Sequence, residues 1–130
     1  MYNNFSILKN NKKMTTQEVA DKFYEWMQTG DFEKIYTELY SKDATSKEAP
    51  GSDWKDANNL EEIFVKGKKW NDSMEAMHGG TTAKPVVAGN YFTSFMTMDF
   101  TPKGGQRTNM EEIGLYGVKD GKIISEAFFY

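Results

Sequence analysis

The spacing of apolar residues changes once along this chain, from a helical period to an alternating one. Before the pair Gly79-Gly80, apolar residues recur three and four positions apart, and after it they alternate with polar ones. The predicted helices cover 16–29, a shorter segment after Asp31, and 59–77, and the predicted strands lie near 81–88, 91–102, 107–118 and 122–130. Helices followed by an antiparallel meander predict an α+β domain.

The start of the first helix has a clear local signal. Thr15 and Glu18 have the spacing of a capping box, and Gly30 stands where a left-handed cap would end the helix. A length of 130 residues suits one hydrophobic core. We therefore expect a single domain over 14–130 and a flexible N-terminal extension over 1–13.

Composition argues against several classes of function. The net charge is -3 without a basic patch, so neither nucleic acid nor a membrane surface is an expected partner. No apolar run approaches the roughly 20 residues of a spanning helix, and the N-terminus lacks a signal peptide, which favours a cytoplasmic protein. With no cysteine and one histidine, His78, we expect no disulfide, no metal site and no cofactor.

The last strands can be placed in register from their loop. A three-residue loop at 103–105 places Met96 opposite Glu112. One face then carries Phe92, Ser94, Met96, Met98, Met110, Glu112, Gly114 and Tyr116, and the other carries Tyr91, Phe95, Ile113 and Leu115. Both faces are apolar, and the helices cover only one. A second subunit is the expected cover of the other face, which predicts a homodimer.

Several short motifs together resemble a known family. They are the Gly-Asp helix link at 30–31, the segment YSKDA at 40–44 and the segment VKDGKI at 118–123. In order and spacing the chain resembles the SnoaL-like, polyketide cyclase-like family of the nuclear transport factor two-like superfamily, from about residue 14 to residue 130. The resemblance implies a cone-shaped, curved antiparallel sheet wrapped around three N-terminal helices, also described as a cystatin-like α+β barrel. It also implies an apolar, open cavity and a dimer through the outer sheet face.

The family resemblance also implies a type of chemistry. Its members include polyketide cyclases that close rings by aldol chemistry, and its relatives include ketosteroid isomerases; both use a carboxylate base in an apolar pocket. The base of the isomerases falls on Glu48. Their two oxyanion donors fall on Phe23 and Gly114, which have no donor side chain, so the resemblance does not imply a steroid-isomerase mechanism for this chain.

Glu112 is the first candidate catalytic residue, because the register places it on the cavity face. Burial there would raise its pKa or pair it with His78. A slip of one residue would expose Glu112 and bury Glu111 instead. His78, predicted at the end of the third helix, has the alternative role of complementing the helix dipole.

Other residues are candidates for the catalytic set or for ligand contact. Glu48 is the family-based base, although it stands beside a polar loop and has the alternative of a solvated rim position. Glu126 alternates with Phe128 and Tyr130 and would face inward near Glu112, where two carboxylates share a proton or bind a cation. The predicted ligand-contact residues are Tyr40, Trp54, Phe92, Met96, Tyr116, Glu126 and Tyr130.

Two functions follow from these candidates. The first is a cofactor-independent enzyme that deprotonates carbon next to a carbonyl in a small apolar compound, with Glu112 or Glu48 as base and His78 or Tyr116 as donor. The second is a non-catalytic, dimeric module that binds a small apolar or aromatic molecule. A dimer with a filled cavity and a purely structural role is a third interpretation.

Overall fold

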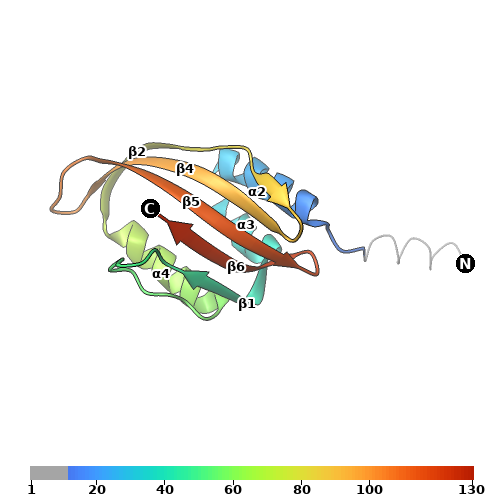
Figure 1. Cartoon of the computed structure of the whole chain (residues 1–130). Coiled ribbons are helices and arrows are strands. Elements are labelled where there is room, and N and C mark those ends of the chain that lie inside the picture. The colour runs from blue at the N-terminus through green and yellow to red at the C-terminus, as the bar shows by residue number, and fades with distance from the viewer. Residues whose placement is uncertain (1–11) are drawn as a thin grey trace, which may run out of the picture.

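The structure is a computed structural model that describes residues 12–130 (Figure 1). Within this range three helices and six strands follow in the order α2 (Thr16–Thr29), α3 (Phe32–Leu39), β1 (Tyr40–Lys47), α4 (Leu60–Asp72), β2 (Met74–Thr82), β3 (Val86–Ala88), β4 (Tyr91–Pro102), β5 (Thr108–Lys119) and β6 (Lys122–Phe129). The expected extension over 1–13 falls mostly on residues that lie outside the described range. No helix among the described residues has the length and apolarity needed to cross a membrane.

The local signals for α2 are confirmed. The Thr15 side chain accepts a hydrogen bond from the Glu18 N–H, and the Glu18 side chain accepts one from the Thr15 N–H. Gly30 ends the helix with a φ of 77°, a conformation that glycine adopts without steric cost. The helix therefore has the bounds predicted for it.

The predicted third helix is too long by about one turn. Helix α4 ends at Asp72, and the Ser73 N–H and hydroxyl both bond carbonyls of the last turn. Asn, Asp and Ser at 71–73 compete with helical backbone bonds, which explains the stop. The residues that follow, including Met74 and Met77, belong to β2 and pair with β4. Their helical spacing was coincidental.

The sheet has the strand order β1-β6-β5-β4-β2, and β3 pairs with β4. Its ladders are antiparallel except for that of β1 and β6, which run parallel, so the expectation of a wholly antiparallel sheet is wrong at this edge. A parallel pair needs a long connection, and here α4 and the strands β2 to β5 lie between β1 and β6 in the chain. In Figure 1 the curved β4–β5 hairpin crosses the molecule, with α4 next to β1. The sheet is open, and it curves around the helices as an α+β cone.

The predicted register of β4 and β5 is confirmed, because Met96 pairs with Glu112 and Tyr91 with Gly117. On the inner face, which packs against the helices, Phe92, Ser94, Met96 and Tyr116 are buried. On the outer face, Tyr91, Phe95 and Ile113 are among the exposed large apolar residues. The two faces are therefore assigned as predicted.

An aromatic group joins α2 to the inner face. Phe23 contacts Phe92 and Tyr116 with ring centroids 5.3 Å and 4.8 Å apart, and Phe92 stacks on Tyr116 at 4.9 Å. These three rings are at most 3% exposed. They form part of the apolar core between α2 and the inner face of the sheet.

Candidate functional site

Buried polar groups gather where β1 and β6 run side by side. Ser46 pairs with Glu126 in the parallel ladder, and both are buried, with exposures of 2% and 4%. The Tyr40 hydroxyl donates a hydrogen bond to Glu126 Oε1, and the Ser46 side chain lies close enough to the same carboxyl group to lower its pKa. Burial raises the pKa of Glu126, although these two side chains act in the opposite direction.

A lysine from α4 joins this group to a second carboxylate. Lys66 Nζ donates to Ser46 Oγ at 2.7 Å and to Glu48 Oε2 at 2.5 Å. The other Glu48 oxygen accepts a hydrogen bond from the Tyr130 hydroxyl at 2.8 Å, and Tyr130 also lies 2.6 Å from Ser52 Oγ. Both oxygens of Glu48 are thus occupied.

Glu112 has a different environment from the other two carboxylates. It lies on the inner face of β5, and no hydrogen bond to its carboxyl group occurs within residues 12–130. Burial, and then the charges of Glu48 and Glu126, raise the pKa of Glu112 to about 7, while Lys66 acts to lower it. A carboxyl group in this state exchanges protons near neutral pH.

Phenolic hydroxyls accompany Glu112. The Tyr116 ring lies along the strand over Gly114, so close that a Cβ at Gly114 would be 2.7 Å from the ring. Glycine at this position is what lets the ring lie there. Burial and the charge of Glu126 raise the pKa of Tyr116 and of Tyr36, so both phenols stay neutral. No hydrogen bond from either hydroxyl is found in the described part of the chain.

His78 does not lie where the sequence predicted. It is on β2 instead of a helix end, it is exposed, and its Nε2 lies 2.8 Å from Thr101 Oγ1. Thr101 and the neighbouring Asp99 stand on the odd-numbered, outer side of β4, so His78 is separated from Glu112 by the sheet. The suggested pairing of His78 with Glu112, and its helix-dipole role, are both wrong because the helix ends at Asp72.

The remaining predicted residues divide between core and rim. Phe92 is packed in the aromatic core and Met96 beside Glu112, and both are buried. Trp54 is half-buried in the loop after β1, and Tyr130 is 47% exposed at the end of the chain. The structure therefore brings Glu48, Glu112, Glu126, Tyr40 and Tyr130 to one region, with Tyr116 between that region and the core.

Sequence reasoning missed Lys66 and Ser46. One signal for Lys66 was present, because it stands three residues after Ile63 and four before Trp70, on the apolar stripe of α4. A lysine in that position is either a snorkelling side chain or a buried partner for an acid. Ser46 had a weaker signal, its alternation with Ala44 on the buried side of β1.

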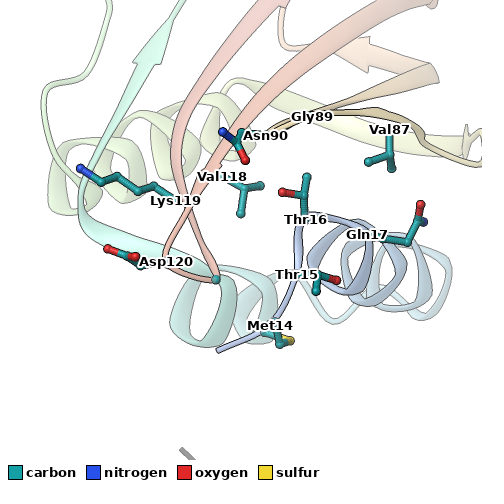
Figure 2. A pocket seen from close by; sticks show the side chains of 11 residues that line it. Met14, Thr15, Thr16, Gln17, Val87, Gly89, Asn90, Val118, Lys119 and Asp120 are labelled. Atoms are coloured by element: carbon teal, nitrogen blue, oxygen red, sulfur yellow. The ribbon is translucent and has the colours of Figure 1, made fainter. Parts of the chain in front are cut away.

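The structure also has an open pocket of about 530 Å³ at the other end of the sheet (Figure 2). It is lined by the start of α2, by Val87, Gly89 and Asn90, and by residues 118–121 of the β5–β6 turn. Figure 2 shows Thr16, Asn90 and Val118 around it, while the Lys119 side chain points away. None of the predicted site residues lines this pocket.

Metal ligands do not form a set in the described range. Over residues 12–130 no group of three or more His, Asp or Glu side chains has an arrangement that would hold a metal ion. The charges of Glu48 and Glu126 raise the pKa of Glu112, yet both of these carboxylates are bonded by side-chain donors. This arrangement of the three carboxyl groups leaves Glu112 as the one suited to proton exchange.

Comparison with known proteins identifies the family. The family model described as the SnoaL-like domain matches residues 14–130, so this chain belongs to the SnoaL-like family. No curated protein sequence matches it significantly. The resemblance noted from the sequence motifs is confirmed.

Solved structures agree with this assignment. One is from Mesorhizobium loti and has the provisional name of SnoaL-like polyketide cyclase, with carbohydrate phosphatase in brackets. It is 36% identical to this chain, with a TM-score of 0.84, and the match covers 90% of this chain and 100% of that protein. An NTF2-like protein of unknown function from Burkholderia pseudomallei is 12% identical, with a TM-score of 0.72 over 90% and 92%. TerC, co-crystallised with polyporic acid, is 14% identical, with a TM-score of 0.70 over 88% and 90%. The two distant structures show that the nuclear transport factor two-like fold is shared.

Proposed function

We propose that this SnoaL-like protein is a cofactor-independent acid/base enzyme that removes a proton from carbon next to a carbonyl group, with Glu112 as the base. The observation that carries this proposal is the state of the Glu112 carboxyl group. Its pKa is raised to about 7, mainly by burial, and no side chain of the described residues bonds it. A base with a pKa near the working pH combines a useful ionised fraction with adequate basicity.

The donor in this proposal is the Tyr116 hydroxyl. When Glu112 takes the carbon-bound proton, the electron pair of the C–H bond moves into a carbon–carbon double bond and negative charge develops on the carbonyl oxygen. A neutral phenol stabilises that charge without adding a positive group to the site. Tyr116 is neutral at physiological pH, and the Glu112 charge is among the causes of its raised pKa.

The proton is returned in the second half of the reaction. In an isomerisation Glu112 gives it back to another carbon of the enolate. In an aldol closure the enolate carbon attacks a second carbonyl, and the new alkoxide takes the proton from Glu112. Either route regenerates the Glu112 carboxylate. An apolar substrate suits this proposal, because Met96 pairs with Glu112 across the sheet and the Tyr36 and Tyr116 phenols lie near enough for its charge to raise their pKa values.

Glu48 and His78 have lesser roles in this proposal. Both Glu48 oxygens accept hydrogen bonds, from Lys66 and Tyr130, so neither oxygen is left free to accept a proton from a substrate. His78 is exposed on the outer side of the sheet. Glu112 and Tyr116 are therefore preferred over the other pairings of base and donor.

The test is deuterium exchange into a flat, apolar ketone. Wild-type protein should speed the incorporation of deuterium from D2O at the α carbon of 2-tetralone, followed by proton NMR. Glu112→Gln keeps the size of the side chain and should reduce the rate by about 100-fold or more, within the usual range for a general base. Glu111→Gln, one residue away on the outer face, should match the wild type.

The alternative is a non-catalytic binding module. It is favoured by the TerC structure, in which a relative of this fold is co-crystallised with a small organic molecule. Under this alternative, 2-tetralone and related ketones would bind wild type and Glu112→Gln alike, and neither protein would exchange the α protons above the buffer rate. A rate for Glu112→Gln equal to that of the wild type would remove Glu112 as the base.

A further inference from the structure

Lys66 is the centre of a hydrogen-bonded chain that connects four parts of the molecule. From α4 it reaches Ser46 of β1 at 2.7 Å and Glu48, which follows β1, at 2.5 Å. Ser46 pairs with Glu126 of β6 in the parallel ladder and lowers the pKa of its carboxyl group, and Glu48 continues the hydrogen bonds to Tyr130 at the chain end. The chain includes two of the three carboxylates of the site and leaves out Glu112.

The placement of Lys66 is unusual for a lysine. Its side chain is 16% exposed and that of Glu48 is 10% exposed, whereas Lys68, two residues along the same helix, is 78% exposed. Removing the two charges of an ion pair from water has a free-energy cost, which their mutual attraction must offset. Apolar residues of similar size would stabilise the fold as well as a buried ion pair does. A role in the site therefore explains the pair better than stability.

We propose that Lys66 is a positioning residue that binds Glu48 directly and Glu126 through Ser46, and so leaves Glu112 as the one carboxylate free to accept a proton. This inference rests on the function proposed above for Glu112. Lys66 itself touches no reacting atom. It acts by fixing the conformation and charge of the groups around the base.

The surroundings of Glu112 show why this arrangement matters. The acidic groups that influence it are Glu48, which follows β1, and Glu126 on β6; phenols come from Tyr36 on α3, Tyr116 on its own strand and Tyr130 at the chain end. Among the described residues, Lys66 is the cation that acts on Glu112. Without it, Glu48 would keep the Tyr130 hydroxyl but lose its cationic partner, and its negative charge near Glu112 would be unbalanced.

The test is a carboxyl titration by carbon NMR of wild type and Lys66→Met. Loss of the positive charge should move the titration midpoint of Glu112 upward by about one pH unit, the size expected for a charge at close range in a partly buried site. Lys66→Arg, which restores the charge, should return the midpoint to within about 0.3 unit of the wild-type value. The acid limb of the pH profile for deuterium exchange should move in parallel.

Lys68→Met is the matched control, since it removes the same charge from the same helix. Lys68 is exposed and lies 3.7 Å from Asp72, so its loss should leave the Glu112 midpoint unchanged. If Lys66→Met does not fold, Lys66→Gln keeps an N–H donor at this position and should show the same upward movement of the midpoint.

The outcomes separate the two proposals. A raised Glu112 midpoint that is equal in wild type and Lys66→Met overturns the role of Lys66 and leaves Glu112 as the proposed base. An ordinary midpoint for Glu112 in the wild type contradicts the proposed function itself. An equal movement in Lys68→Met would show a general effect of net charge and would also overturn the inference.

Discussion

Two neighbouring residues of β5, Glu112 and Ile113, lie on opposite faces of the sheet. Each is of the type that is usually found on the other kind of face, since the charged residue is turned inward and the apolar residue outward. Glu112 faces the helices and is partly buried beside two other carboxylates, whereas Ile113 faces away from them and is 46% exposed. Soluble proteins usually bury the apolar side chain and expose the charged one. We expect this pair of departures to reflect a function on each face, because an exposed apolar patch favours a protein contact and a partly buried carboxyl group is frequent at functional sites.

The outer face has the continuity of an interaction surface. Phe95, Ile113 and Phe129 pair across three adjacent strands, and each is at least 41% exposed. Tyr91 lies further along the same face and is 55% exposed. We expect a second copy of the chain to cover this surface, as the sequence predicted, so that the outer face is a subunit contact and the inner face is the site.

The largest effect is expected from a charge at the centre of the outer face. Ile113→Glu should raise the Kd of the homodimer by about 100-fold, because it places an unpaired charge in the middle of an apolar contact. Sedimentation of wild type at about 20 μM should show a dimer and that of the variant a monomer. Gln17→Glu adds the same charge at an exposed position on α2 and should remain dimeric. A monomeric wild type would contradict the assignment of the outer face as a subunit contact.

For the inner face, the property to measure is the pH dependence of the free energy of unfolding. Native Glu112 has a pKa of about 7 against 4.5 for an ordinary glutamate, so the folded state holds its proton more tightly than the unfolded state does. The resulting stability is fully present below pH 4.5 and is lost as the pH rises toward 7. Glu112→Gln does not ionise, so it should be more stable than wild type by about 1–3 kcal/mol at pH 8 and equally stable at pH 4.

Urea unfolding at the two pH values measures this difference directly. The same variant is expected to lose the deuterium-exchange activity, so a gain in stability and a loss of activity would come from one side chain. An equal free energy of unfolding for the two proteins at both pH values would mean that Glu112 is solvated.

The assignment of residues to the two faces of β5 could be predicted from the sequence, because it depends on pairing between strands that are close in the chain. The loop predicted at 103–105 gave the correct register of β4 and β5, although the connection between the strands spans 103–107, and alternation then placed Glu112 and Ile113 on opposite faces. The Thr15 cap and Gly30 similarly determined the bounds of α2. These features require contacts only between nearby segments or across a short hairpin.

The features that failed depend on contacts between distant segments. The end of α4 was placed too late because Trp70, Met74 and Met77 fit a helix as well as they fit a helix followed by a strand, and the pairing of β2 with β4 decided between them. The parallel pairing of β1 with β6 also joins distant segments. It is this pairing that places Ser46 beside Glu126, within reach of Lys66, and the spacing along the chain contains no sign of it.

The smallest expected effect belongs to Glu111, and it tests the assignment of the two faces most directly. Glu111 pairs with Thr97 on the outer side and is exposed, so its charge is hydrated and screened in the native state. Glu111→Gln should therefore change the free energy of unfolding by less than about 0.5 kcal/mol at pH 4 and at pH 8. It differs from Glu112→Gln by one position along the strand, with the same chemistry and the same change in net charge. A pH-dependent gain in stability in Glu111→Gln, with none in Glu112→Gln, would mean that the strand presents its other face to the helices and that the base was assigned to the wrong residue.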